Sequence, residues 1–249
     1  MRYFLEIAYD GGRFHGWQVQ PNALSVQEVL DDSLSKVLRE PIATVGSGRT
    51  DTGVHASQQF VHFDVAQELA PQQTVFRLNR LLPADIAAKN LYLVPDEAHA
   101  RFDAMARTYH YYLTLNKDPF QRHHTYYYSR PLNVAKMNEA AAILLKYEDF
   151  TTFSKVKGDT KHYRCTMYEA KWQQEGETLI FTIRANRFLR GMVRLVVGTL
   201  LDVGKGKLTV AQFEQIIASQ DRSKSSAAAP AEGLFLAKVA YPEGLLSGE

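Results

Sequence analysis

The segment Gly46–Ala56 brings together residue types that could do chemistry. It holds a carboxylate at Asp51, a guanidinium at Arg49 and an imidazole at His55, among glycines that allow tight turns and close approach of another molecule. An aspartate carboxylate is an anion at neutral pH, and it can act as a nucleophile or base once a substrate excludes water. Arg49 could stabilise that charge or bind a phosphate. The same composition also fits a surface turn in which Asp51 binds nearby backbone, so the residues alone leave both interpretations open.

Two common phosphate-binding motifs do not describe this segment. The pattern GxxxxGK[ST] of a P-loop is absent, and glycines at 46, 48 and 53 do not have the spacing of a dinucleotide-binding fingerprint. The sequence therefore does not predict a nucleotide cofactor.

A tyrosine-rich stretch, Arg107–Asn116, is the second candidate. Its pattern predicts a strand in which Tyr109 and Tyr111 share one face. A flat ring with a polar tip suits stacking on an unpaired nucleobase. Tyrosine is also common in strands for packing alone, and both interpretations remain.

Four arginines form the third candidate: Arg184, Arg187, Arg190 and Arg194. The pattern predicts a helix over Phe188–Val203, on which positions 187, 190 and 194 would lie on one face. This face is either a solvated basic surface or a site for phosphates, and we assign Arg187 and Arg190 to contacts with an RNA backbone.

Composition sets the broad class of the protein. The chain has 249 residues, 45% hydrophobic and 22% charged, with 29 Lys and Arg against 27 Asp and Glu. This usage excludes a disordered or polybasic protein but allows a local nucleic-acid surface. The lone Cys165 cannot form an internal disulfide and is interpreted as a packed strand residue. The histidines lack metal-ligand spacing, so no metal is predicted. The absence of a signal peptide and of a long apolar run predicts a cytoplasmic protein without a membrane span.

The elements that must position these residues follow from hydrophobic periodicity. Helix caps are expected at Ser25 and Thr209, and a small-residue linker at 223–232. The expected strands are Arg2–Tyr9, Ile42–Val45, Gln59–Val65, Ile86–Val94, Arg107–Asn116, Arg164–Gln173, Thr178–Ala185 and Leu234–Tyr241. The expected helices are Val26–Leu38, Thr74–Leu82, Val134–Leu145, Phe188–Val203 and Thr209–Ser219.

The order of these elements predicts an α+β fold. The adjacent strands at 164–185 read as an antiparallel pair, which breaks strict strand–helix alternation. Both halves of the chain contain strands and helices, and we expect two domains, residues 1–105 and 106–249.

The motifs resemble those of one known family. The run Gly48–Ala56 is similar to the active-site motif of the tRNA pseudouridine synthase A (TruA) family, with Thr52 where alanine is usual. The resemblance continues in order along the chain, and a tail after Tyr241 adds little to it. The other matching segments are Tyr9–Gly11, Gly16–Gln18, Ser25–Glu28, Ala100–Ala104, Arg107–Tyr111, Asp149–Phe153, Ala185–Arg194 and Glu232–Leu236.

The resemblance implies roles for particular residues. Asp51 would be the catalytic aspartate, and Tyr109 would stack on the target base. Arg49 would help to extrude the nucleotide, and Arg194 would pair with the catalytic carboxylate. Leu234 would lie in the apolar wall of the pocket, and the approach to that wall at 223–232 would be ordered rather than a linker.

The resemblance also implies a fold and a reaction. The fold would be that of pseudouridine synthases, with two similar α/β halves forming one extended, mainly antiparallel sheet, flanking helices and a central cleft. The enzyme would isomerise uridine to pseudouridine in the anticodon stem-loop of tRNA, at positions 38 to 40, by base flipping and without a cofactor. It would act as a homodimer. Whether Asp51 attacks C6, attacks C1′ or removes the 2′ proton is left open by the sequence.

Two other classes of protein use similar residues. A non-catalytic RNA-binding protein would need the arginines and tyrosines but would gain nothing from Asp51. A hydrolase of glycosidic bonds usually needs two paired carboxylates, and no second acid accompanies Asp51 in its loop.

Overall fold

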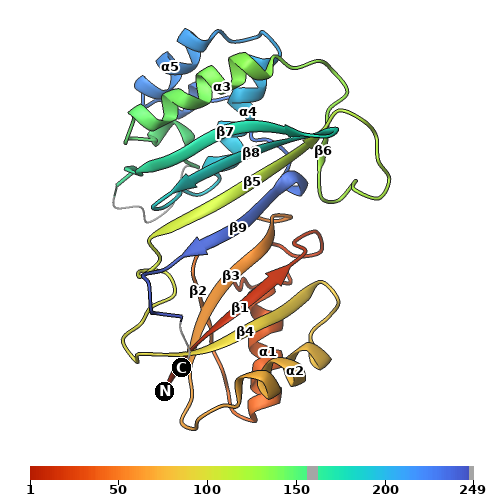
Figure 1. Ribbon diagram of the computed structural model, residues 1–249, viewed down its shortest axis with the longest axis vertical. Coiled ribbons are helices and arrows are strands. Elements are labelled where there is room, and N and C mark those ends of the chain that lie inside the picture. The colour runs from red at the N-terminus through yellow and green to blue at the C-terminus, as the bar shows by residue number, and fades with distance from the viewer. Residues whose placement is uncertain (156–161, 247–249) are drawn as a thin grey trace. The chain divides into compact units, whose positions relative to one another are not determined.

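The computed structural model describes residues 1–155 and 162–246. The fold is mixed α+β, with mainly antiparallel sheet and flanking helices (Figure 1). The chain divides into two compact units, one comprising Met1–Ala106 with Leu236–Glu249, the other Arg107–Phe235. We call them unit 1 and unit 2 and describe each by itself. The division into domains 1–105 and 106–249 stays a prediction.

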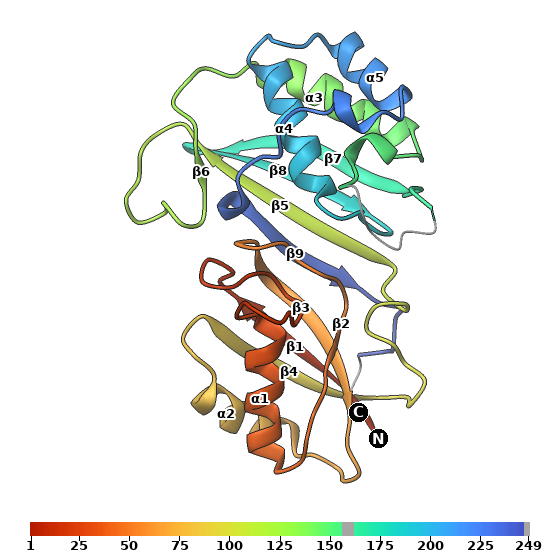
Figure 2. The same ribbon diagram turned by 180° about the vertical axis from the view of Figure 1, so that it is seen from behind.

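Unit 1 is a sheet with two helices on one of its faces (Figure 2). The strand order is β4-β1-β3-β9, with β2 paired to β3. Of β9, the first two residues are counted with unit 2. The elements are β1 Arg2–Tyr9, α1 Val26–Leu38, β2 Val45–Gly46, β3 His55–Asp64, α2 Pro71–Leu81, β4 Ile86–Val94 and β9 Leu234–Ala240.

The register of unit 1 places the end of β1 beside the start of β3. Tyr9 pairs with Ala56 of β3 and with Ile86 of β4, and both ladders are antiparallel. The residues that follow β1 therefore lie next to the residues that precede β3. This pairing positions the segment Asp10–Trp17 against the loop that carries Asp51.

Helix α1 begins where the sequence predicts. The Ser25 hydroxyl accepts a hydrogen bond from the Glu28 N–H at 3.2 Å, as a capping residue should. Val26, Leu30 and Leu34 are buried and form the stripe that faces the sheet. Three predicted starts in unit 1 need correction. Strand β3 begins at His55 rather than Gln59, and helix α2 begins at Pro71 rather than Thr74. Of the strand expected at 42–45, only Val45 is in a strand.

Unit 2 is a second sheet with helices α3, α4 and α5 on one face (Figure 2). The strand order is β5-β8-β7, with β6 parallel to β5. Its elements are β5 Ala106–Thr114, β6 Tyr126–Tyr127, α3 Val134–Ile143, η1 Leu144–Lys146, η2 Thr151–Phe153, β7 Met167–Glu175, β8 Thr178–Ala185, α4 Met192–Gly204, α5 Val210–Ala218, η3 Arg222–Lys224 and η4 Ala231–Gly233.

The antiparallel pair expected at 164–185 is confirmed as β7 and β8. Its first strand begins at Met167, so Cys165 is a buried residue outside the strand. Burial raises the pKa of its thiol to about 11, which leaves it protonated at neutral pH. The predicted cap at Thr209 is also confirmed, since Thr209 and Gln212 form a reciprocal capping box.

The expected helix over Phe188–Val203 begins late. Gly191 has a left-handed backbone, with φ of +69°, and α4 starts only at Met192. Arg187 and Arg190 therefore lie in a loop before the helix and do not share a helical face with Arg194. Residues 187–194, which we call the basic segment, comprise the last part of the connection between β8 and α4 and the first residues of α4.

The linker interpretation of residues 223–232 is wrong. The Ser226 N–H donates to the Thr199 hydroxyl at 3.2 Å, and the Ala229 N–H donates to the Arg194 carbonyl at 2.9 Å. A side chain at Gly198 would lie 1.9 Å from the Ala227 carbonyl oxygen, so this stretch packs directly on α4. Within the described residues, no helix is long and apolar enough to cross a membrane.

Candidate active site

Asp51 lies in a tight turn between β2 and β3. The residues Ser47–Val54 form what we call the aspartate loop, and Asp51 is half-buried within it. The Val54 N–H donates to the Asp51 carbonyl at 3.1 Å, and Gly53 has a φ of +75°, which only glycine adopts easily. The turn therefore fixes the backbone on both sides of the carboxylate.

The segment after β1 holds the aspartate loop from one side. The Tyr9 hydroxyl and the Thr50 hydroxyl are hydrogen-bonded at 2.9 Å in a buried position. The Trp17 N–H donates to the Thr50 carbonyl at 3.2 Å. Gly16 has a φ of +88°, and a Cβ there would lie 2.5 Å from the Thr50 carbonyl oxygen. The residue before Asp51 is thus held by its side chain and by its backbone.

A second close approach lies on the other side of the turn. A Cβ at Gly11 would lie 2.0 Å from the Val54 carbonyl oxygen, so only glycine fits. At the start of the loop, the Ser47 hydroxyl donates to Gln59 at 2.7 Å, and the Gln59 amide donates to the Gly48 carbonyl at 2.9 Å. Both ends of the aspartate loop are therefore fastened to β1, β3 or the segment between β1 and α1.

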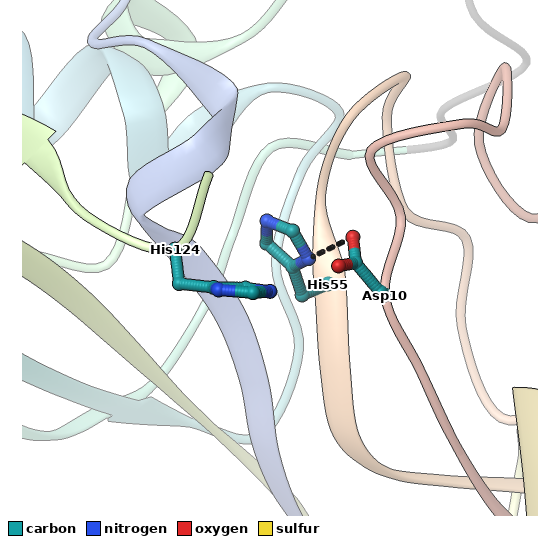
Figure 3. A group of neighbouring side chains, drawn as sticks. All are labelled: Asp10, His55 and His124. Carbon is teal, nitrogen blue, oxygen red and sulfur yellow. Dashed lines mark ion pairs between the residues drawn. The ribbon is translucent and has the colours of Figure 1, made fainter. Parts of the chain in front are cut away.

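The imidazole of His55 belongs to this framework. Its ring is 1% exposed, and Nδ1 lies 3.0 Å from Asp10 Oδ1 (Figure 3). The same nitrogen lies 3.1 Å from the Gly11 backbone nitrogen. A single ring nitrogen either donates to Asp10 or accepts from Gly11, so the presence or absence of a hydrogen on Nδ1 decides which of the two it binds. His55 therefore orients the turn at Asp10–Gly11 against the base of the aspartate loop.

Arg49 has a different environment from Asp51. It is exposed, and its guanidinium makes no hydrogen bond or ion pair with another described residue. Gly48 beside it has open space around the position of a Cβ. The cation is thus available to a phosphate, which agrees with its expected role toward the nucleotide but does not test that role.

Tyr109 lies in β5 of unit 2, opposite Ile183 of β8. The side chain is half-buried, and its ring meets that of Phe188 edge to face at 5.1 Å and 88°. Phe188 belongs to the basic segment. This geometry holds the tyrosine ring by its packing, which is what a stacking platform requires.

Arg194 is held at the start of α4. Its Nε donates to the Ala229 carbonyl at 2.7 Å, while Ala229 N–H donates back to the Arg194 carbonyl. Nearby, Arg187 Nη1 lies 3.2 Å from His162 Nε2, and the Arg190 side chain is exposed. In the basic segment, Arg194 is therefore anchored by its side chain, and the side chains of Arg187 and Arg190 are not buried.

Leu234, the first residue of β9, is buried in unit 2. A Cβ at the preceding Gly233 would lie 2.7 Å from the Tyr112 carbonyl oxygen, which brings this stretch against β5. The Tyr111 hydroxyl donates to the Pro230 carbonyl at 3.1 Å. Burial raises the pKa of Tyr111 far above its usual range, so its hydroxyl acts here as a structural donor.

The structure adds residues that the sequence analysis did not single out. Tyr9, Asp10 and Trp17 hold the aspartate loop although they come much earlier in the chain. In the sequence they stood only within the segments Tyr9–Gly11 and Gly16–Gln18 that resemble the family, with no role assigned to them. The candidate residues divide between the units: Asp51 and Arg49 are in unit 1, and the remaining five are in unit 2.

Comparison with known proteins gives one consistent result. A family model described as tRNA pseudouridine synthase matches residues 7–103 and 140–242, which is most of the chain. A tRNA pseudouridine synthase A of Bacteroides fragilis is 51% identical over 97% of each chain. The corresponding protein of Bacteroides thetaiotaomicron is 51% identical over 100% of this chain and 93% of its own. That of Bacillus subtilis is 39% identical over 97% of this chain and 99% of its own.

Proposed function

The chain belongs to the tRNA pseudouridine synthase A family, and on that premise we propose that it isomerises uridine to pseudouridine in tRNA. In this reaction the N1–C1′ glycosidic bond breaks, and a bond forms between C5 and C1′ of the same nucleotide. The hydrogen on C5 leaves as a proton and N1 takes up a proton, so the product has the same atoms as the substrate. The reaction needs neither an oxidant nor a reductant.

The observation that carries the proposal is the fixation of the aspartate loop. Thr50 is bonded to Tyr9 and Trp17, and Gly11 and Gly16 each leave room for backbone where no side chain would fit. A surface turn needs no such restraint. A carboxylate that must meet one atom of a bound nucleotide does, because a misplacement of about 1 Å can cost about a hundredfold in rate. Asp51 is accordingly proposed as the catalytic group.

Most of the proposed contacts to RNA come from unit 2, and Arg49 of unit 1 adds one. A stacked base must be flipped out, which costs a few kcal/mol. Stacking on an aromatic ring contributes about 1–3 kcal/mol per base, and we assign this role to Tyr109. Arg49 would contact the extruded nucleotide, Arg194 would pair with the carboxylate, and Leu234 would line the apolar wall. Arg187 and Arg190 would bind the RNA backbone.

The finer parts of the proposal follow the family. The target uridines are those at positions 38 to 40 of the anticodon stem-loop, and the protein acts in the cytoplasm as a homodimer without a cofactor. The fold of the family would place the active site in a cleft between two similar halves that share one extended, mainly antiparallel sheet. These statements are carried over from the family to which the chain belongs.

Tritium release tests the proposed reaction directly. An unmodified tRNA transcript carrying [5-³H]uridine is incubated with the wild type, with Asp51→Asn and with Asp32→Asn. Asp32 is an exposed carboxylate paired with Lys36, which makes it a matched control. The wild type and Asp32→Asn should release tritium, while Asp51→Asn should fall by at least about 10²–10⁴-fold and still bind tRNA.

Other outcomes would contradict the proposal in distinct ways. Normal turnover by Asp51→Asn would remove the aspartate from the chemistry. Tight tRNA binding with no release by any variant would favour a binding protein. Accumulation of free uracil would favour hydrolysis of the glycosidic bond over isomerisation.

A further inference from the structure

The turn Asp118–Thr125 follows β5 in unit 2 and is internally ordered. Asp118 Oδ1 accepts from the Phe120 N–H at 2.8 Å, and the His124 N–H donates to the Gln121 carbonyl at 2.8 Å. The buried Thr125 donates from its hydroxyl to the same carbonyl at 3.1 Å. Pro119 fixes the backbone between them. The turn therefore holds the Phe120 backbone in one orientation.

The side chain of Phe120 is almost entirely in water. It is 92% exposed, and its ring contacts no other ring or cation among the described residues. Phe102, another exposed phenylalanine, does have such contacts. Its ring centroid lies 4.2 Å from that of His99 and 5.7 Å from the Arg101 guanidinium carbon. Phe102 is thus 73% exposed but has these ring and cation contacts, whereas Phe120 has neither among the described residues. A large apolar ring presented outward on a fixed turn is a feature of binding surfaces.

Two cationic residues flank Phe120 in the sequence. Lys117 and Arg122 are exposed and make no ion pair with another described residue. The one carboxylate in the turn, Asp118, is occupied by the Phe120 N–H. An aromatic ring between unpaired cations combines stacking on a base with attraction to its phosphates, the combination that recognises single-stranded nucleic acid.

The position of the turn in unit 2 fits a contact beyond the target base. Tyr109 and Thr114 are five residues apart on β5, which corresponds to roughly 16 Å of strand. The turn begins shortly after Thr114, and the His124 ring lies 6.2 Å from that of Phe235, next to Leu234. The turn is thus at the end of the strand that carries Tyr109 and beside the residue proposed for the pocket wall.

We infer that Phe120 stacks on an unpaired base of the tRNA other than the target uridine, while Lys117 and Arg122 bind the adjacent phosphates. This inference rests on the proposed function and extends it to a second base.

Phe120→Trp provides the first test. The wild type already contains Trp17 and Trp172, both buried, so its signal serves as the background. Adding unmodified tRNA should quench the extra indole of Phe120→Trp as a base stacks on it. Phe76→Trp is the matched control, because Phe76 is 64% exposed on α2, and its indole should not change.

Phe120→Ala and Phe120→Leu provide the second test. Both should weaken tRNA binding about 5- to 150-fold, the range that the loss of one base–aromatic stack produces, while Phe120→Tyr retains affinity. Leucine keeps an apolar side chain but cannot stack, so it separates stacking from simple burial. The rate at saturating tRNA should stay within about twofold of the wild type, since Phe120 takes no part in the chemistry.

Three results would overturn the inference. The first is a Phe120→Ala affinity equal to that of Phe76→Ala, together with no quenching of the indole introduced by Phe120→Trp. The second is a Phe120→Leu variant that binds as well as Phe120→Tyr. The third is a smaller oligomer for Phe120→Ala in sedimentation, which would assign the ring to a contact between copies of the chain. Tritium release by the wild type remains the separate test of the proposed function.

Discussion

The aspartate loop and the basic segment both carry charged side chains, but the fold restrains them differently. In the aspartate loop, Gly16 faces backbone: a Cβ would lie 2.5 Å from the Thr50 carbonyl oxygen. In the basic segment, the atoms nearest to a Cβ at Gly191 belong to the flexible side chain of Lys155, at 3.0 Å. Both glycines are left-handed, with φ of +88° and +69°. The difference is therefore one of packing, not of backbone conformation.

This difference matches what each region has to do. A group that attacks or deprotonates one atom needs a fixed position, whereas attraction to phosphates acts over several ångströms and tolerates movement. The basic segment is fastened at its base by Asn186, which exchanges hydrogen bonds with Thr166 at 2.9 and 3.1 Å. Its outer side chains, Arg187 and Arg190, are not buried. The aspartate loop, the candidate for chemistry, is thus more tightly restrained than the outer side chains of the basic segment, the candidates for RNA binding.

The largest expected effect comes from Gly16→Ala. The variant has to adopt a left-handed backbone and push against Thr50, which together should cost about 3 kcal/mol of the free energy of unfolding. Because Thr50 adjoins Asp51, the maximal rate of tritium release should fall by up to about a hundredfold. Denaturant unfolding and single-turnover kinetics measure the two effects.

Gly191→Ala is the matched control for that substitution. It carries the same left-handed penalty, about 1–2 kcal/mol, but Lys155 can move aside. The rate at saturating tRNA should stay near that of the wild type. If the two variants lost rate equally, the contrast in restraint between the regions would be wrong.

An intermediate effect is expected from the pair Tyr9 and Thr50. Tyr9→Phe and Thr50→Val each remove one partner of the buried 2.9 Å hydrogen bond and should cost about 1 kcal/mol of the free energy of unfolding. The double variant should cost less than the sum, because the second change removes a bond that is already lost. Strictly additive costs in chemical denaturation would show that this bond does not couple β1 to the aspartate loop.

The sequence predicted local features better than contacts over long separations. The caps at Ser25 and Thr209 and the antiparallel pair β7–β8 are confirmed, because each depends on residues a few positions apart. The Tyr9–Thr50 bond joins residues 41 positions apart, and no periodicity encodes it. The late start of α4 was missed because the apolar stripe continues through Leu189, whereas the left-handed Gly191 interrupts the backbone.

The candidate site shows the same limit. Residue types alone singled out Asp51, Tyr109 and the arginines, but they did not decide between a surface turn and a catalytic loop. The close approaches at Gly11 and Gly16 distinguish them, and these depend on the fold of unit 1. Composition likewise predicted a linker at 223–232, because small residues pack closely on a helix as readily as they form a flexible chain.

The smallest effect on stability is expected from neutralising the basic segment. Arg187→Gln and Arg190→Gln together should leave the free energy of unfolding within about 0.5 kcal/mol of the wild type, since neither side chain is buried. If each binds one phosphate, the plot of log affinity for tRNA against log salt concentration should become shallower by about 1.4–1.8. The rate at saturating tRNA should not change. Arg164→Gln is the control, because Arg164 is already paired with Glu148 at 2.8 Å, and its salt slope should match that of the wild type. A fall in the saturating rate with no change in slope would move these arginines from backbone binding to the chemistry, and would remove the contrast between the two regions.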